Sequence, residues 1–238
     1  MEDEDIEAIA ALQDPVRRRL YEYVVAQGRE VGRNEAAEAA GVARTLAAHH
    51  LDRLTEAGLL ESGSRRLTGR SGPGAGRPAK VYRRAPGERS VSLPARDYRT
   101  AAELLAEAAE LAGLDAELCE AARRRGDALR EATGPCESLE EAMERLASRG
   151  YEPHLEDAGA GVDAADATDD VTATAAAVIR MRNCPFHAVA ERFPPLVCGM
   201  NLALLEGLLG ESDAVRARMD ARPGECCVVV EPSKNNDH

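Results

Sequence analysis

Residues 34–60 read NEAAEAAGVARTLAAHHLDRLTEAGLL. The first part, residues 34–40, is rich in Ala and Glu and predicts a short helix that ends at Gly41. A second helix is predicted for residues 43–57, before Gly58. Side chains recur in it at helical spacing, at Leu46, His50, Leu51 and Leu54. Two helices joined by a tight glycine turn form a helix-turn-helix motif, whose second helix enters the major groove of DNA.

The flanking segments extend this motif into a small domain. Asp14-Pro15 marks the start of a helix over residues 16–26, with Asp as the N-cap and Pro at the first helical position. Residues 60–68 and 79–84 predict two strands joined by a Gly-rich loop that contains several cations. Helices followed by a basic hairpin, or wing, are the pattern of a winged helix-turn-helix domain, which we assign to residues 1–90.

Two groups of side chains are candidates for contact with double-stranded DNA. The second helix of the motif would present its exposed side chains to base edges in the major groove. The positions best placed for this are Arg44, Thr45, Ala48, His49 and Arg53. The wing would follow the phosphate backbone, where contacts set affinity and make it salt-dependent. The cations expected there are Arg65, Arg66, Arg70, Arg77 and Lys80.

The distribution of charge supports a nucleic-acid partner although the net charge is −12. Residues 1–90 carry 15 Lys and Arg against 14 Asp and Glu, whereas residues 91–238 carry 15 against 28. Between Ser62 and Arg84 there are seven Lys and Arg and no acidic residue. An acidic protein with one concentrated basic segment is typical of a regulator that contacts DNA through one face.

Hydropathy indicates a cytoplasmic protein with no membrane partner. No apolar run approaches the length of a membrane span, and the acidic first residues do not form the cationic start of a secretory signal. In the cytoplasm cysteines stay reduced, so we expect the six cysteines of this chain to be ligands or redox sensors rather than structural disulfides.

The second half predicts an α+β fold. Residues 91–135 form a helical linker with apolar stripes, at Ala101, Leu104, Leu105, Ala108 and Leu111, that suit a homodimer interface. Residues 136–232 form a sensor domain with a small antiparallel sheet, and residues 233–238 a disordered tail. The helices are expected at 97–112, 115–132, 138–148, 186–192 and 195–209, and the strands at 151–156, 174–182, 215–221 and 225–231.

Four cysteines lie where these predicted elements meet. Cys184 closes a strand, Cys198 occupies the first turn of a helix, and Cys226 and Cys227 open the last strand. The positive end of a helix stabilises thiolate, the form that binds metal. Because adjacent side chains of a strand point to opposite faces, we expect only one of Cys226 and Cys227 to reach a shared site. Cys119, in a helix, and Cys136, in a turn, are interpreted as non-ligating.

Three thiolates leave a fourth ligand to be found. The candidates are His187, the second member of the Cys226 and Cys227 pair, or a ligand from outside the chain. Such a set fits an iron–sulfur cluster with one unusual ligand, or zinc held by three cysteines and a histidine. Both metals stay open at this point, because the sequence contains no CxxC pair.

Several motifs of this chain occur together in a known family. They are Leu46–Leu60, Gly69–Arg84 with GRPAKVY, Gly150–Pro153, Asn183–His187, Leu196–Cys198, Asn201–Leu209 and Pro223–Cys227. With these motifs, residues 10–84 resemble the winged-helix domain of ArsR-like regulators, and the whole chain resembles the Suf-operon repressor group. The resemblance implies a homodimeric repressor of iron–sulfur assembly genes that binds a palindromic operator under control of a cluster, expected to be [4Fe-4S]. Some members have another cysteine between the positions of Cys198 and Cys226, and this chain does not, so zinc remains the alternative.

The expected function is therefore a transcriptional repressor whose DNA affinity depends on a thiolate-bound metal. The alternative is a winged-helix regulator that responds to a small organic effector or to thiol redox state, with no metal. An enzyme with Cys184 as nucleophile and His187 nearby is a third hypothesis. The sequence supplies no oxyanion site, second base or catalytic motif for it, so we expect no enzymatic activity.

Overall fold

The computed structural model describes residues 2–65, 78–157, 177–210, 212 and 214–233. The chain divides into two compact units, Met1–Arg96 and Asp97–His238. No helix in the described part of the chain is long and apolar enough to cross a membrane. The finer division into four segments stays a prediction.

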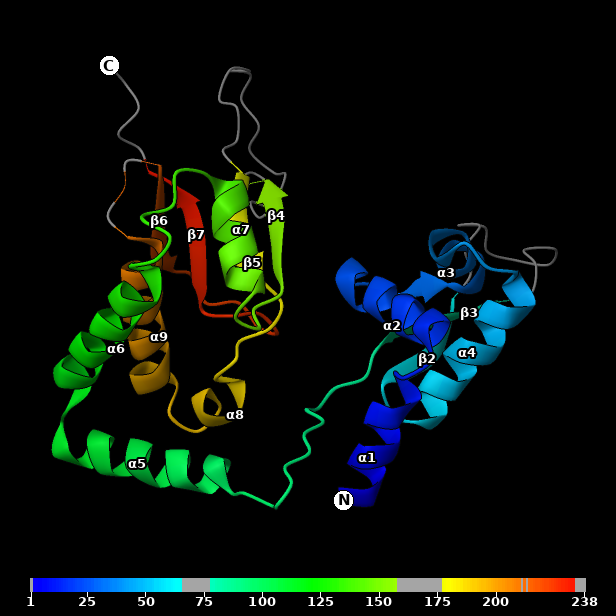
Figure 1. Cartoon of the computed structure of the whole chain (residues 1–238), viewed down its shortest axis with the longest axis horizontal. Coiled ribbons are helices and arrows are strands. Elements are labelled where there is room, and N and C mark those ends of the chain that lie inside the picture. Colours follow the sequence, from blue (N-terminus) through cyan, green and yellow to red (C-terminus); the bar gives the residue numbers. More distant parts are fainter. Residues whose placement is uncertain (1, 66–77, 158–176, 211, 213, 234–238) are drawn as a thin grey trace, which may run out of the picture. The chain divides into compact units, whose positions relative to one another are not determined.

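The first unit combines helices with a small antiparallel sheet of strand order β1-β3-β2 (Figure 1). Its elements are α1 (Glu2–Ala11), α2 (Pro15–Gln27), β1 (Val31–Gly32), α3 (Arg33–Ala40), α4 (Arg44–Glu56), β2 (Leu60–Arg65) and β3 (Ala79–Arg84). The two helices predicted on either side of Gly41 are confirmed, and so are the two strands of the hairpin. The short strand β1 was not predicted, because two residues carry no periodicity.

Local sequence signals fix the ends of these helices. The Asp14 side chain accepts the backbone N–H groups of Val16 and Arg17, which caps α2. Gly41, at a φ of +65°, ends α3 in the left-handed conformation that permits the tight turn before α4. The core that joins the elements includes Leu20, Val24, Leu51, Leu54 and Tyr82. Leu46 does not belong to it: Ala47 takes the inward position, and Leu46 is 42% exposed.

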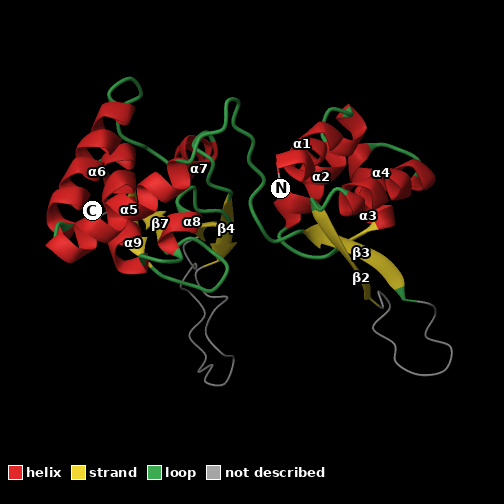
Figure 2. Ribbon diagram, turned by 90° about the horizontal axis from the view of Figure 1, so that it is seen from below, coloured by secondary structure: helices red, strands yellow, loops and turns green. Residues whose placement is uncertain are grey.

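The second unit combines helices with a four-stranded antiparallel sheet (Figure 2), whose strand order is β4-β5-β7-β6 (Figure 1). Its helices are α5 (Tyr98–Ala112), α6 (Asp115–Arg130), α7 (Leu139–Ala147), α8 (His187–Ala190) and α9 (Pro194–Leu209). Its strands are β4 (Pro153–Asp157), β5 (Ala177–Met181), β6 (Val215–Met219) and β7 (Val228–Pro232). These confirm a mixed α and β composition with a small antiparallel sheet. Two expected segments lie partly outside the described residues: the strand expected at 174–182 is described from Ala177 on, and of the tail expected at 233–238 only Ser233 is described.

The backbones of α6 and α9 are in direct contact along their crossing (Figure 1). A Cβ atom on Gly126 would overlap the carbonyl oxygen of Leu204 and lie 2.7 Å from the amide nitrogen of Leu208. A Cβ atom on Gly207 would in turn overlap the carbonyl oxygen of Arg123. The absence of a Cβ atom at both glycines therefore lets the two helix backbones pack in direct contact.

Candidate DNA interface and cysteine cluster

Helix α4 buries one face in the core and exposes the other. Its inward residues are Ala47, His50, Leu51 and Leu54. Of the positions expected to read bases, Arg44, Thr45, His49 and Arg53 are exposed and Ala48 is half-buried. Arg53 forms an ion pair of 2.8 Å with Glu56 on the same helix, so its guanidinium is partly compensated. The exposed face thus offers hydrogen-bond donors at the spacing of successive helical turns.

A groove of about 1510 Å³ lies between the start of α3, the first turn of α4 and the β2–β3 hairpin. The cations that line it are Arg29, Arg33, Arg44, Arg65 and Lys80, and the carboxylates are Glu30 and Glu35. A surplus of cations in a groove beside an exposed helix suits a phosphate backbone. Arg29 and Arg33 were not predicted as DNA contacts. Their position on either side of Val31-Gly32, next to a helix start, could have indicated that role.

The described hairpin cations differ in how closely they are paired with a carboxylate. Arg65 is exposed and lies 3.7 Å from Glu30, whereas Lys80 donates to the Asp52 carboxylate over 2.7 Å. Arg66, Arg70 and Arg77 lie outside the described residues, so their expected phosphate contacts stay a prediction.

Asp52 of α4 is the centre of a polar network that reaches the hairpin. Its Oδ1 atom accepts hydrogen bonds from Lys80 Nζ and from Tyr82 Oη, each over 2.7 Å. Arg33 Nη2 lies 3.2 Å from Oδ2, and Arg33 Nε donates to Tyr82 Oη over 2.8 Å. Burial raises the pKa of Asp52, but the hydrogen bonds from Lys80 and Tyr82 outweigh it, so the pKa is lowered overall. The carboxylate is therefore charged at neutral pH.

Four cysteines of the second unit form two thiol pairs. Cys198 Sγ lies 2.7 Å from Cys227 Sγ, and Cys184 is hydrogen-bonded to Cys226. Negative charge on Cys226 also raises the pKa of Cys198, and this interaction links the two pairs. We call these four residues the cysteine cluster. It draws on three separate stretches of chain, one after β5, one in α9 and one before β7.

Hydrogen bonds from neighbouring elements hold the cysteine cluster in place. Cys226 N donates to Met181 O over 2.9 Å, and Asn201 Nδ2 donates to Cys226 Sγ over 3.3 Å. Tyr151 Oη donates in turn to Asn201 Oδ1, over 2.5 Å. Both Tyr151 and Asn201 are buried, so the amide that faces the sulfur has a fixed orientation. Both residues fall within motifs quoted above, Gly150–Pro153 and Asn201–Leu209, but the sequence assigned neither of them a role beside the cysteines.

The thiols of the cluster differ in acidity. The hydrogen bond from Cys184 lowers the pKa of Cys226 to about 7, against the opposing effect of burial. The same hydrogen bond, together with burial, raises the pKa of Cys184. Burial raises the pKa of Cys198 to about 12, and the hydrogen bond with Cys227 acts in the same direction. Negative charge in the cluster therefore resides most readily on Cys226.

Two sequence expectations about these cysteines are wrong. Cys198 lies in the second turn of α9, because that helix begins at Pro194, so the N-terminal amides do not stabilise its thiolate. Cys226 and Cys227 precede β7, which begins at Val228. Strand alternation therefore does not apply to them. Cys226 contacts Cys184 and Cys227 contacts Cys198, so the expectation that only one of them reaches a shared site stays a prediction.

The remaining candidates lie apart from these contacts. The His187 side chain is 71% exposed, and its Nε2 atom lies 3.4 Å from Glu191 on α8. Cys136 is fully buried in the core, where burial raises the pKa of its thiol. Cys119 is half-buried on α6, beside Gly199.

The cluster fits a soft metal in the type of its donors but not in their present spacing. No group of three or more His, Cys, Asp or Glu side chains among the described residues is arranged to hold a metal ion. Zinc–sulfur bonds of about 2.3 Å in a tetrahedron separate the sulfurs by about 3.8 Å. Cys198 and Cys227 are closer, at 2.7 Å. The arrangement is that of paired thiols, and a metal requires the sulfurs to move apart.

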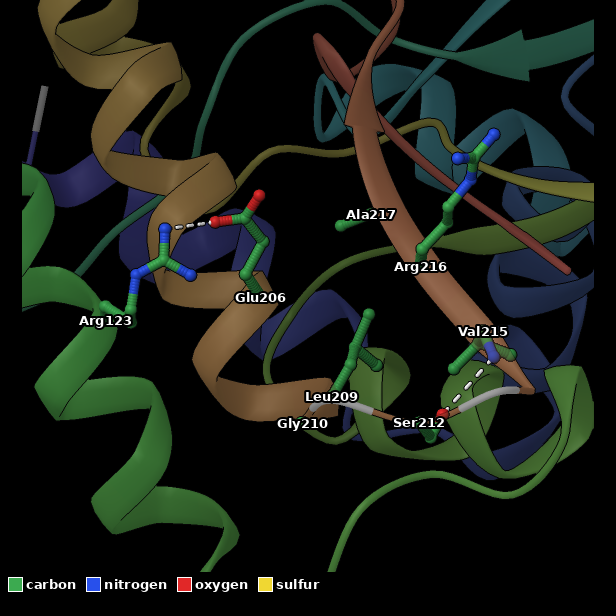
Figure 3. Close-up of a pocket in the computed structure, with 8 residues that line it drawn as sticks. All are labelled: Arg123, Glu206, Leu209, Gly210, Ser212, Val215, Arg216 and Ala217. Atoms are coloured by element: carbon green, nitrogen blue, oxygen red, sulfur yellow. Dashed lines mark hydrogen bonds and ion pairs between the residues drawn. The ribbon is translucent and has the colours of Figure 1, made fainter. Parts of the chain in front are cut away.

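A second cavity, of about 460 Å³, lies beside α6, α9 and β6 (Figure 3). Its two arginines are already compensated: Arg123 pairs with Glu206 over 2.5 Å, and Arg216 with Glu231 over 2.5 Å. Ser212 Oγ accepts the backbone N–H of Val215 over 3.3 Å. These pairs leave neither arginine as an uncompensated charge for an organic anion.

Comparison with known proteins finds a family match within the first unit. Residues 12–63 match the family model described as a helix-turn-helix domain. Neither the curated proteins nor the solved structures contain a match to this chain. The match spans α2 to β2 and so includes α3, the turn at Gly41 and the exposed face of α4. The chain therefore contains a helix-turn-helix domain, which indicates a DNA-binding regulator.

Proposed function

We propose that this protein is a homodimeric, cytoplasmic transcriptional repressor of the winged-helix type. It binds a palindromic operator in double-stranded DNA, and the state of the cysteine cluster controls its affinity. The resident group we propose is an iron–sulfur cluster of the [4Fe-4S] type, with zinc as the alternative. No catalytic role is proposed.

The observation that supports DNA binding best is the cation-lined groove beside the exposed face of α4, within the helix-turn-helix domain. A helix of this motif contacts bases, and a hairpin beside it contacts phosphates. In this proposal α4 is the recognition helix, and the β2–β3 hairpin is the wing.

The test of DNA binding starts from a random pool of duplexes, because the operator is unknown. Wild-type protein should enrich one sequence family with two-fold symmetry. We expect the enriched duplex to bind at least about a thousandfold more tightly than an unrelated duplex of the same length. A pool that stays random after repeated selection would contradict the proposal.

The proposed metal control is supported by the donor type of the two thiol pairs, whose sulfurs would move apart to hold a metal. Cys184, Cys198, Cys226 and Cys227 would hold the group, and Asn201 would orient Cys226. When bound, a metal supplies positive charge that keeps the thiolates ionised and ties together β5, α9 and β7. Loss of those links would release the three segments and change the affinity for DNA.

Metal analysis tests this directly. Protein purified without oxygen should contain iron and acid-labile sulfide with broad visible absorption, or stoichiometric zinc without colour. Cys198→Ser and Cys226→Ser should lose the metal, whereas Cys119→Ser should retain it. Protein that contains neither metal after anaerobic purification and reconstitution would rule out metal control.

A second candidate is a thiol–disulfide switch, favoured by the contact between Cys198 Sγ and Cys227 Sγ. A peroxide would accept two electrons and two protons from these thiols, leaving a disulfide and two waters, or one water and one alcohol if the peroxide is organic. Mass spectrometry of peroxide-treated, metal-free protein should show a linked Cys198–Cys227 peptide. Unlinked thiols together with unchanged DNA binding would exclude this candidate.

A further inference from the structure

We infer that Asp52 is a positioning residue that sets the preference of the protein for its operator, by holding the β2–β3 hairpin against α4. This inference rests on the proposed DNA-binding function. Asp52 is the acidic side chain that joins the recognition helix to the hairpin, through Lys80 and Tyr82 of β3.

The geometry of the network makes Asp52 a connector rather than a surface charge. Its carboxylate is 40% exposed, but it binds side chains from two other elements, β3 and α3. Tyr82, which is fully buried, both donates to Asp52 and accepts from Arg33. Lys80 Nζ also lies 5.2 Å from the centroid of the Tyr82 ring. The network therefore fixes the hairpin base relative to α4 through charged hydrogen bonds.

A fixed distance between helix and hairpin has a consequence for DNA recognition. The helix reads the major groove while the hairpin follows the adjacent backbone, so both can bind together only at one spacing. The same carboxylate keeps Lys80 and Arg33 from neutralising phosphates on unrelated DNA. Asp52 thus raises specific affinity through position and lowers nonspecific affinity through charge.

Loss of Asp52 should change the affinity for the selected duplex in the direction opposite to the one that charge alone predicts. Asp52→Ala removes a negative charge from the DNA-binding face and frees two cations, which alone would strengthen binding to every duplex. We expect instead that nonspecific binding strengthens while binding to the selected duplex weakens. The ratio of the nonspecific to the specific dissociation constant should fall at least about tenfold, the change that 1.4 kcal/mol produces.

The salt dependence provides a second readout. On nonspecific DNA, the slope of log affinity against log salt should steepen by about 0.9 for each freed cation that a phosphate takes up. Tyr82→Phe removes the bridging hydroxyl without changing charge. It should weaken binding to the selected duplex and leave the slope on nonspecific DNA unchanged.

Glu61→Ala is the matched control. Glu61 pairs with Arg83 over 2.8 Å, and both lie on the hairpin itself, so this change also removes a carboxylate and frees a cation. It breaks no link to α4, and we expect affinity for both duplexes to rise together.

The experiment compares the three variants and the wild type by fluorescence anisotropy, on the duplex selected by wild-type protein and on an unrelated duplex. Thermal unfolding of each variant confirms that it is folded. If Asp52→Ala behaves like Glu61→Ala, the positioning role is wrong and the DNA-binding function still stands. If the wild type selects no duplex, the DNA-binding function itself fails.

Discussion

Burial decides what the adjacent histidines of α4 can do. His49 is exposed, while His50 is buried and its Nδ1 atom accepts a hydrogen bond from Arg17 Nε over 3.4 Å. Helical spacing placed residue 50 on the inward side, but it did the same for Leu46, which is exposed. Helical spacing predicts only which side of a helix is apolar. The packing of the neighbouring helices α2 and α3 decides which residues of that side are buried.

His50 should make the stability of the first unit depend on pH. Burial lowers its pKa, so the folded protein keeps the ring neutral while the unfolded chain takes up a proton below its ordinary pKa. Stability is therefore lost as the pH falls below about 6.5, the ordinary pKa of histidine, toward the lowered pKa of the folded state. We expect His50→Gln to reduce this loss in denaturant unfolding curves. His49→Gln is the exposed control, and equal behaviour of both variants would contradict the assignment.

Arg44 should contribute directly to DNA binding. It is exposed in the first turn of α4 and lines the groove. Arg44→Ala should weaken binding to the selected duplex by about 1–3 kcal/mol. Arg124→Ala on α6, which removes an exposed arginine paired with Glu120, should leave affinity unchanged. Equal losses would mean that only net charge matters, and anisotropy titrations at one salt concentration distinguish these outcomes.

The elements themselves were largely predictable. The predicted cap at Asp14 and glycine turn at Gly41 are confirmed, and the helices predicted from residues 97 and 138 begin at Tyr98 and Leu139. The packing of α6 on α9 was not predictable, because a glycine inside a helix gives no hint of the helix that approaches it. The four cysteines were named from the sequence, but how they pair with one another was not. The start of β7 at Val228 rather than at residue 225 changed which way two of them point.

The α6–α9 crossing gives a sharp stability prediction. Gly126→Ala or Gly207→Ala places a methyl group against backbone atoms of the facing helix, which cannot yield. Each change should lower the free energy of unfolding by about 1–3 kcal/mol or more. Gly199→Ala, on α9 as well, meets only Cys119 Sγ at 3.6 Å and should be neutral or stabilising, since Ala favours a helix. Thermal unfolding measures all three, and similar effects would contradict close backbone contact.

At the scale of the whole molecule, α5 carries an apolar surface on its outer side. Leu104, Leu105 and Leu111 are 61%, 72% and 83% exposed, while Ala106 packs inward against Phe193 and Leu196. The sequence predicted this stripe as a homodimer interface, and that role stays a prediction. Exposed leucines gathered on one helix are typical of a surface that another chain covers.

A charge on the α5 stripe should separate the proposed dimer. Leu105→Glu and Leu111→Glu place a carboxylate where the partner would pack, so light scattering should report the mass of one chain instead of two. Glu110→Lys, on the same helix but outside the stripe, also changes the charge and should leave the dimer intact. A wild-type protein that is monomeric at all concentrations tested would exclude the dimer.

The two glycines at the α6–α9 crossing also limit how a signal can spread. Cys198 lies near the start of α9, and Gly207 lies near its end. Because the backbones touch, we expect α6 and α9 to move together as one unit. If the proposed control displaces Cys198, both helices should move with it, together with the turn that connects α6 to α5. The proposal therefore predicts that the second unit responds in one step rather than by degrees.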